Sequence, residues 1–218
     1  MTSQISRKSA EYEYQYEDST LTHTYSYLTE PLFSMLSEKA KSGKGKLRVL
    51  DLGCGNGSLS NLIAQQGYQV VGVEESASGI AIARQKFPDC RFIQASIYDA
   101  PKAELINAFD VVIAVEVIEH LLYPKELVIL ASKCLKSGGN LIITTPYHGY
   151  FKNLLLALSG KMDKHFTVSW DGCHIKFFSV KTLTNLLEIE GYTDINFKFL
   201  GRFTYLWKSM LCSASVAE

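Results

Sequence analysis

The stretch from Val49 to Gly57 constrains the fold of this chain more than any other part of the sequence. Leu47 to Leu52 is a short apolar run that follows a loop rich in glycine and lysine, and this pattern predicts a buried strand. Gly53, Gly55 and Gly57 follow the strand at once. Glycine permits a tight turn and lets a ligand lie against the backbone, because no Cβ stands in the way.

The residues after the glycines predict a helix from Leu59 to Gln66, with Ser58 as its N-terminal cap. A strand, a glycine-rich turn and the free N–H groups of a helix N-terminus together form a nucleotide-type site. Asp51 precedes the glycines, where its carboxylate would repel a pyrophosphate but suit an ammonium group. The next predicted strand, Gln69 to Val73, is followed by Glu74, which is placed to accept from both hydroxyls of a ribose.

The pattern Asp-x-Gly-x-Gly-x-Gly, with an acidic residue at the end of the second strand, resembles the class I S-adenosylmethionine (SAM) methyltransferases from Leu47 to Leu200. The alternatives are a glycine-rich turn without a ligand and a dinucleotide oxidoreductase, and Asp51 argues against the second. The resemblance implies SAM as cofactor and a loop after the third strand that flanks the adenine. The implied cofactor-binding residues are Asp51, Gly53, Cys54, Gly55, Glu74, Glu75, Ser96, Ile97, Val115 and Glu116.

A cluster of titratable residues follows the fourth predicted strand, Phe109 to Val115, beside the expected cofactor crevice. Glu116, Glu119 and His120 span one helical turn, so the spacing lets all three side chains converge on one face. Two carboxylates and an imidazole suit Mg²⁺, Mn²⁺ or Zn²⁺. The alternative is that Glu119 caps the helix and His120 packs under the cofactor.

Glu-x-x-Glu-His, a later Gly-Gly turn and a strand ending in Thr-Pro are similar to the O-methyltransferases of ubiquinone biosynthesis. In that group the matching residues are associated with a divalent cation, which implies a metal site of Glu116, Glu119 and His120. The chain departs from the group in its longer segment after the fifth strand. Amino-group methylation of bases or glutamine is disfavoured, because those enzymes have Asn/Asp-Pro-Pro-Tyr/Phe where this chain has Glu116 to Glu119.

The segment from Tyr147 to Lys176 breaks the rhythm of strands and helices and is rich in aromatic residues, lysine and histidine. We expect it to form a substrate cap with a short apolar helix, Asn153 to Ser159. His148 and His174 lie at its junctions with the scaffold and, with His120, are the candidate catalytic residues. A histidine that removes the proton of a hydroxyl acceptor typically contributes ~10²–10⁴-fold. The alternative is that these histidines and aromatic residues only bury the insertion.

Alternating strands and helices imply right-handed crossovers and an α/β fold with a doubly wound sheet. We predict seven strands, mostly parallel with an antiparallel last strand, as the resembling fold has. Helices are predicted at Tyr25–Lys41 on the sheet edge, at Ser76–Phe87, at Pro124–Leu135 ended by Ser137-Gly138-Gly139, and at Ser179–Glu190. The last two strands are predicted at Asp194–Leu200 and Phe203–Met210, followed by a disordered tail from Ser213.

The sequence suggests four regions along the chain. These are an N-terminal arm and helix (1–44), a SAM-binding core (45–146), a cap (147–178) and a C-terminal helix with a strand pair (179–218). Tyr12, Tyr14 and Tyr16 alternate with Glu and Gln, so the arm is either mobile or a lid over the active site.

Composition narrows the function classes. The formal net charge is zero, which gives no electrostatic footprint for nucleic acid. Five cysteines without CxxC spacing indicate the reduced thiols of a cytoplasmic protein. No signal peptide is expected, and no apolar run reaches the ~20 residues of a membrane span. Peripheral membrane contact through Phe203 to Leu211 and a homodimer are additional expectations, although a strand is favoured for that segment.

We therefore predict a SAM-dependent methyltransferase that acts on a hydroxyl oxygen of a small-molecule acceptor, with Mg²⁺ or another divalent cation. One alternative is transfer to carbon or nitrogen of a small metabolite or glycan precursor without a metal. The other is a regulatory protein that binds SAM without turnover.

Overall fold

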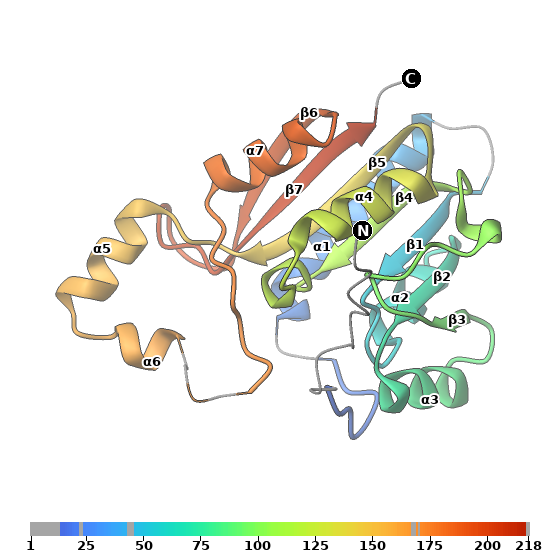
Figure 1. Cartoon of the computed structure of the whole chain (residues 1–218), viewed down its shortest axis with the longest axis horizontal. Coiled ribbons are helices and arrows are strands. Elements are labelled where there is room, and N and C mark those ends of the chain that lie inside the picture. Colours follow the sequence, from blue (N-terminus) through green and yellow to red (C-terminus); the bar gives the residue numbers. More distant parts are fainter. Residues whose placement is uncertain (1–13, 22–23, 43–45, 167–168, 170, 217–218) are drawn as a thin grey trace, which may run out of the picture.

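The computed structural model describes residues 14–21, 24–42, 46–166, 169 and 171–216. Within these ranges the chain forms one seven-stranded sheet in the order β3-β2-β1-β4-β5-β7-β6 (Figure 1). The strands are β1 (Arg48–Leu52), β2 (Gln69–Glu74), β3 (Arg91–Gln94), β4 (Phe109–Val115), β5 (Leu135–Pro146), β6 (Tyr192–Leu200) and β7 (Ser209–Val216). The first five are mutually parallel, and β7 is antiparallel to both β5 and β6. The predicted doubly wound sheet with an antiparallel last strand is confirmed.

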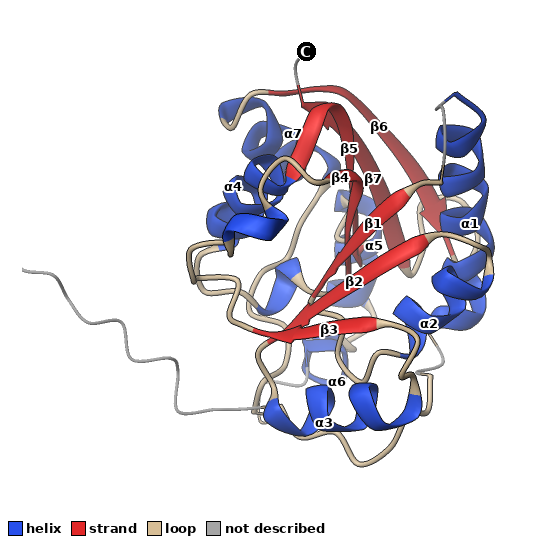
Figure 2. Ribbon diagram, turned by 90° about the vertical axis from the view of Figure 1, so that its right-hand side faces the viewer, coloured by secondary structure: helices blue, strands red, loops and turns tan. Residues whose placement is uncertain are grey.

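Helices cover both faces of the sheet, with α1 and α2 on one side and α4 and α7 on the other (Figure 2). The helices are α1 (Tyr25–Ser42), α2 (Ser58–Gln65), α3 (Ala77–Lys86), α4 (Pro124–Cys134), α5 (Tyr150–Leu158), α6 (Met162–Phe166) and α7 (Val180–Ile189), with 3₁₀ turns η1 (Ala103–Leu105) and η2 (Ile118–His120). Only η1 lies between β3 and β4, where the alternation predicted a helix. The short α5 and α6 project beyond the C-terminal end of β5 (Figure 1).

Helix α1 packs on a face of the sheet, whereas the sequence predicted that it would lie on the sheet edge. Leu28, Leu32 and Leu36 are buried on one stripe of the helix. They belong to a core cluster that also contains side chains from β1, β4, β5 and β7: Val49, Val111, Ile113, Val115, Ile142 and Leu211. An apolar stripe of this length gains more by covering the centre of a sheet than its edge, because both partners are then removed from water.

The C-terminal end of the chain differs from the prediction. The strand expected at Phe203–Met210 is a turn through Leu206, and β7 begins only at Ser209. The expected disordered tail is therefore wrong through Val216, while residues 217–218 lie outside the described part. β7 lies between β5 and β6, and its residues belong to both core clusters: Met210, Cys212 and Ala214 to the one that contains α7, and Leu211 to the one that contains α1. Serine, alanine and cysteine carry little apolar signal, and burial in a central position replaces it.

The Gly-Gly turn also has a different role from the one expected. Helix α4 ends at Cys134, and β5 begins at Leu135, so Gly138 and Gly139 lie inside the strand and do not end the helix. The pairing of β4 with β5 shifts register between Phe109 and Val111, whose partners are Leu135 and Asn140. The additional residues of β5, which include both glycines, lie within this irregularity. Gly138 has a φ of 67°, and a Cβ on Gly139 would lie 2.8 Å from the carbonyl oxygen of Lys136.

Two predicted helix caps had different outcomes. Ser179 caps α7, and its side chain and that of Thr182 form a reciprocal capping box. Ser58 is not a cap, because the N-cap of α2 is Gly57 in a left-handed conformation, with a φ of 80°. The hydroxyl of Ser58 donates instead to the carbonyl of Ser19 in the N-terminal arm. The start of α2 is thus free of a capping side chain and faces the glycine loop.

Candidate cofactor and active site

The loop between β1 and α2 requires glycine at each of the three expected positions. Gly53, Gly55 and Gly57 have φ values of 76°, 55° and 80°, which side chains with a Cβ rarely adopt. A Cβ on Gly53 would lie 2.6 Å from Cγ2 of Val117. The N–H groups of Gly53 and Cys54 donate to the carbonyl of Val73, at 2.8 and 3.1 Å, and fix the loop to β2. Bare backbone therefore lines this end of the parallel strands.

Two carboxylates flank the loop, the buried Asp51 and the partly buried Glu74. Asp51 is 1% exposed and accepts a hydrogen bond from the hydroxyl of Ser60 at 2.6 Å. Burial raises the pKa of Asp51 to about 7, since few groups compensate the charge. Glu74 accepts from the N–H of Gly55 at 2.9 Å and of Ser76 at 2.8 Å, and burial also raises its pKa. A cation beside Asp51 and hydroxyl donors beside Glu74 would compensate both charges.

The loops after β2 and β3 meet beside Glu74. The hydroxyl of Ser96 donates to the carboxylate of Glu75 at 3.0 Å, and its N–H donates to Asp99 at 2.9 Å. Ile97 packs on the main core, and Val115 is buried at the end of β4. These predicted cofactor residues therefore lie along the carboxyl ends of β2, β3 and β4, as the prediction requires.

Cys54 borders the loop but directs its side chain away from it. The thiol lies in a small cluster with Ile80, Ala83 and Phe92. Burial raises the pKa of Cys54 well above its usual value, so the thiol stays protonated. A small residue is needed here for packing, and any contact with a ligand falls to the backbone.

The N-terminal arm crosses the glycine loop. The described residues 14–21 are held by side chains of the loop and of α3: Ser76 Oγ donates to Tyr14 O (2.7 Å), Tyr16 N donates to Ser78 Oγ (2.9 Å), and Asn56 Nδ2 donates to Asp18 O (2.8 Å) and Thr20 O (3.2 Å). The ring of Tyr16 occupies the space that a Cβ on Gly55 or Gly79 would need. The ring of Tyr16 therefore packs on the glycine loop, a lid over the active site stays a prediction, and Tyr12 lies outside the described residues.

Tyr25 is a candidate site residue that the sequence did not reveal. It begins α1, and burial and the nearby carboxylates Asp51 and Glu116 raise the pKa of its phenol above the usual range. The hydroxyl is therefore close to both the cofactor loop and the end of β4. The only signal in the sequence was one more tyrosine in a tyrosine-rich segment.

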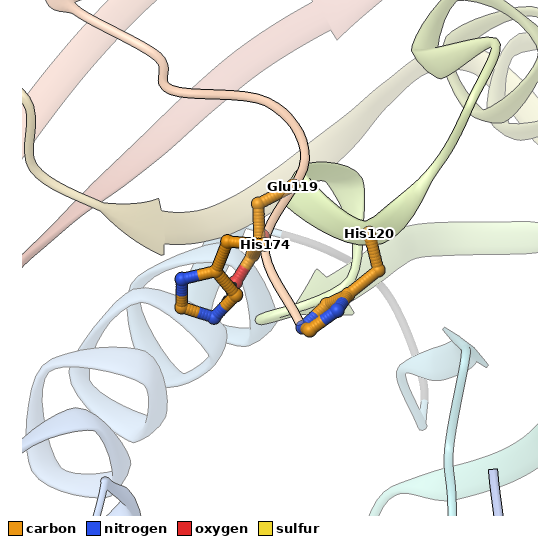
Figure 3. Close-up of side chains that lie close together, drawn as sticks. All are labelled: Glu119, His120 and His174. Carbon is orange, nitrogen blue, oxygen red and sulfur yellow. Dashed lines mark ion pairs between the residues drawn. The ribbon is translucent and has the colours of Figure 1, made fainter. Parts of the chain in front are cut away.

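The structure brings together Glu119, His120 and His174 (Figure 3). One potential ligand atom from each lies within 4.8 Å of the others. Glu119 is fully buried, its Oε1 lies 3.9 Å from Nε2 of His174, and neither carboxylate oxygen accepts a hydrogen bond within the described structure. Burial, and then the charge of Glu116, raise the pKa of Glu119 well above its usual value. A buried carboxylate without partners is costly unless a proton or a cation compensates it.

His174 reaches this cluster because the end of the cap crosses η2. The N–H groups of Ile175 and Lys176 donate to the carbonyl of Glu119, at 2.9 and 3.0 Å. Nδ1 of His120 lies 2.9 Å from the carbonyl oxygen of Gly172. Burial lowers the pKa of His120 and lowers that of His174 to about 4, so both rings are neutral at pH 7 and can offer a lone pair.

Glu116 is not part of this cluster, although the sequence placed it there. The residue has a φ of 55° and precedes η2, so no regular helical turn aligns it with Glu119 and His120. Its carboxylate accepts instead from the hydroxyl of Thr144 at 2.9 Å. The predicted triplet rested on helical spacing, and a left-handed residue at the end of β4 breaks that spacing.

His148 lies in an aromatic environment within the cap. Its ring is buried and contacts His165, Phe166 and Phe177, at centroid distances of 5.0 to 6.0 Å. Burial and the nearby Lys152 lower the pKa of His148 to about 4. The side chain of Asn153 interacts with its ring, although Nδ1 makes no well-formed hydrogen bond among the described residues. His148 is thus a neutral base that is separate from the cluster of Glu119.

Comparison with known proteins agrees with this geometry. Residues 21–196 match the family described as "Methyltransferase domain". Ubiquinone biosynthesis O-methyltransferase of Ruegeria sp. is 32% identical over 172 residues, which cover 74% of this chain and 66% of the relative. The same enzyme of Cronobacter sakazakii is 31% identical over 129 residues, 57% of this chain and 52% of the relative. The matches to these two curated relatives therefore span half to two thirds of the relatives' length. The chain belongs to the methyltransferase-domain family.

Solved structures share the fold. Magnesium protoporphyrin IX methyltransferase from Synechocystis, with bound SAH, has a TM-score of 0.64 and 19% identity over 86% of this chain and 83% of the other. A SAM dependent methyltransferase from Archaeoglobus fulgidus has a TM-score of 0.62 and 20% identity over 85% of this chain and 93% of the other. At these identities the likeness establishes the architecture, and the chemistry must be argued from the site.

Proposed function

We propose that the protein is a SAM-dependent methyltransferase that transfers a methyl group to a hydroxyl oxygen of a small-molecule acceptor. The observation that carries this proposal is the pair of carboxylates, the buried Asp51 and the partly buried Glu74, on either side of the glycine loop. SAM offers an ammonium group for Asp51 and ribose hydroxyls for Glu74. Ser96 and Ile97 would flank the adenine. The relatives named O-methyltransferases support oxygen as the acceptor atom.

In the reaction, the acceptor oxygen attacks the sulfonium methyl as the carbon–sulfur bond breaks, and sulfur keeps the electron pair. The chain must place the two atoms about 3 Å apart in line, which removes a large entropic part of the barrier. The hydroxyl must also lose a proton. His148 is the candidate base that remains if His120 and His174 bind a cation, and Tyr25 lies near enough to Asp51 and Glu116 to orient the reacting groups.

We further propose Glu119, His120 and His174 as ligands of a divalent cation. The fully buried carboxylate of Glu119, which has no hydrogen bond and lies 3.9 Å from Nε2 of His174, and two neutral imidazoles fit such an ion. Two nitrogen donors favour Mn²⁺ or Zn²⁺ over Mg²⁺, which prefers oxygen ligands and several waters. When bound, the cation would lower the pKa of the acceptor hydroxyl. Mg²⁺ remains the prediction of the resemblance, and Glu116 would then be recruited by a local rearrangement.

Other expectations of the sequence stay proposals. Cytoplasmic placement is consistent with free cysteines at all five positions. Phe203 and Tyr205 are exposed in the turn between β6 and β7, near exposed apolar residues of α5, and this surface supports peripheral membrane contact or a homodimer. No helix in the described ranges is long and apolar enough to cross a membrane.

The direct test is methyl transfer from SAM to a catechol, followed by mass spectrometry, in EDTA and after addition of Mn²⁺, Zn²⁺ or Mg²⁺. The proposal predicts a methoxy product that depends on metal. Transfer that EDTA does not affect would contradict the cation and leave methyltransfer in place. Binding of SAM without transfer to any hydroxyl, carbon or nitrogen acceptor would favour a regulatory protein.

A further inference from the structure

Lys152 is buried in a helix that exposes its apolar side chains. Its neighbours on α5, Tyr150, Phe151 and Leu158, are 85%, 48% and 76% exposed, whereas Lys152 is only 7% exposed. An amphipathic helix normally has the opposite arrangement, with lysine in water and leucine inside. Burying an ammonium group is unfavourable, so this inversion calls for a compensating partner.

The described structure does not provide an anionic partner for this ammonium group. Nζ donates one hydrogen bond, to the carbonyl of Tyr147 at 2.8 Å, and forms no ion pair with a described carboxylate. An ammonium group has three donors, so two are left. Glu116 acts on Lys152 through space, but its carboxylate accepts a hydrogen bond from the hydroxyl of Thr144.

The surroundings of Lys152 are basic. Arg202, from the turn between β6 and β7, and two histidines of the cap, His148 and His165, interact electrostatically with it. The buried polar atoms of the same segment have neighbours of their own, since Asn153 interacts with His148 and Thr145 with Glu119. Buried polar groups in proteins are nearly always hydrogen-bonded, so a buried ammonium group with two unused donors in basic surroundings points to a bound anion.

The position of this cluster ties it to the acceptor. Tyr147 follows β5 directly, and Lys152 lies in the first turns of the helix that begins at Tyr150, so Lys152 stands at the carboxyl ends of β4 and β5 with Glu116. Ligands of open α/β sheets bind at this edge. The cofactor loop lies at the end of β1, which is the neighbour of β4 in the sheet. An acceptor bound beside SAM can therefore reach Lys152.

We propose that the methyl acceptor carries an acidic group, such as a carboxylate, and that Lys152 binds this group from under the cap. This inference rests on the proposed function and specifies its substrate class. A charged hydrogen bond in a buried site is stronger than one between neutral groups, and the basic surroundings favour an anion over a neutral isostere. The role of Lys152 is to position the acceptor and not to take part in bond making.

The experiment compares two catechols that differ only in charge, 3,4-dihydroxybenzoate and 3,4-dihydroxybenzamide. Each is titrated calorimetrically into the full chain saturated with S-adenosylhomocysteine. We expect the wild type to bind the carboxylate at least about tenfold more tightly than the amide. Lys152→Met should abolish this preference and leave the affinity for the amide within about twofold. Lys152→Arg should keep most of it, and Lys161→Met, which removes an exposed lysine of the same cap, should change neither affinity.

Equal affinity of the wild type for the two catechols, or failure to bind the carboxylate, would overturn the proposal. Equal loss of both ligands in Lys152→Met would overturn it as well, because a merely structural lysine does not distinguish ligand charge. If Lys152→Met does not fold, the wild-type preference and its retention in Lys152→Arg decide the question. Failure of the wild type to bind S-adenosylhomocysteine is a separate result, which would count against the proposed function.

Discussion

The cofactor half and the acceptor half of the site differ in how well their polar groups are satisfied. In the cofactor half, Asp51, Glu74 and Ser96 have partners within a few residues of the glycine loop. In the acceptor half, the buried carboxylate of Glu119 has no hydrogen bond and lies 3.9 Å from Nε2 of His174, and Lys152 has two unused donors. The first half is therefore largely preformed, whereas the second needs a ligand to complete its hydrogen bonding.

The largest expected effect breaks the preformed half. Gly53→Ala forces a Cβ into a left-handed residue and against Val117, whereas Gly67→Ala meets the same backbone strain in open space. We expect Gly67→Ala to lower the free energy of unfolding by roughly 1–2 kcal/mol. Gly53→Ala should lose roughly 1–3 kcal/mol more through overpacking. Urea denaturation measures the free energy of unfolding of both variants. Equal losses would show that the contact with Val117 adds no cost to the backbone strain at Gly53.

The next prediction uses pH to sharpen the contrast. The pKa of Asp51 in the folded protein is about 7, above the ~3.9 of an unfolded aspartate, so the folded state binds more protons between these values. The stability of the ligand-free protein should fall as pH rises through this window, by roughly 4 kcal/mol at most.

Asp51→Asn should remove this part of the pH dependence, and Asp89→Asn, at an exposed aspartate, should not. The free energy of unfolding measured in urea from pH 5 to pH 8 checks both variants. Because the charged carboxylate binds the ammonium group, SAM affinity should rise over the same window. A wild-type free energy of unfolding that does not change with pH would contradict the raised pKa of Asp51.

A third prediction concerns the metal ligands of the acceptor half. His174→Ala should weaken Mn²⁺ binding by at least about tenfold, since it removes one of three donors. Glu116→Gln should leave Mn²⁺ binding nearly unchanged, because Glu116 bonds to Thr144 and not to the cluster. Electron paramagnetic resonance of free Mn²⁺ during titration gives both constants. If Glu116→Gln weakened Mn²⁺ binding more than His174→Ala did, the metal site would be the one predicted from the sequence, Glu116, Glu119 and His120.

The smallest expected difference compares two helix starts. Ser179→Ala removes the capping box of α7, the helix that follows the cap segment 147–178. We expect it to lower the free energy of unfolding by about 1 kcal/mol. Ser58→Ala at the start of α2 loses only the bond to the arm, so roughly half of that is expected. Thermal unfolding of the two variants measures the difference. An equal or larger loss for Ser58→Ala would mean that the arm contributes more to the fold than one hydrogen bond.

The two halves also differ in how far the sequence predicts them. The cofactor half is local: strand, glycines, helix and the carboxylates Asp51 and Glu74 lie within a single β-α-β unit, where spacing along the chain sets spacing in the fold. The strands β1 to β4 and the cap of α7 were predicted for the same reason. Ser58 was misassigned because Gly57 takes a left-handed conformation that local preference does not reveal.

The acceptor half depends on contacts between distant residues. His174 joins Glu119 only because the end of the cap crosses η2, and no spacing in the sequence encodes that crossing. Lys152 looks like an ordinary polar residue of an apolar helix until its burial is seen. β7 was missed because its small residues depend on neighbouring strands and helices for burial. In each case a tertiary contact decides what local propensity leaves open.

The central claim is that Asp51 and Glu74 hold SAM at the glycine loop, and calorimetric titration of SAM tests it most directly. We predict saturable binding to the wild type, at least about tenfold weaker binding to Asp51→Asn and Glu74→Gln, and no change in Glu188→Gln, an exposed carboxylate of α7. Absence of SAM binding to the wild type, or equal affinity in all four proteins, would contradict the account.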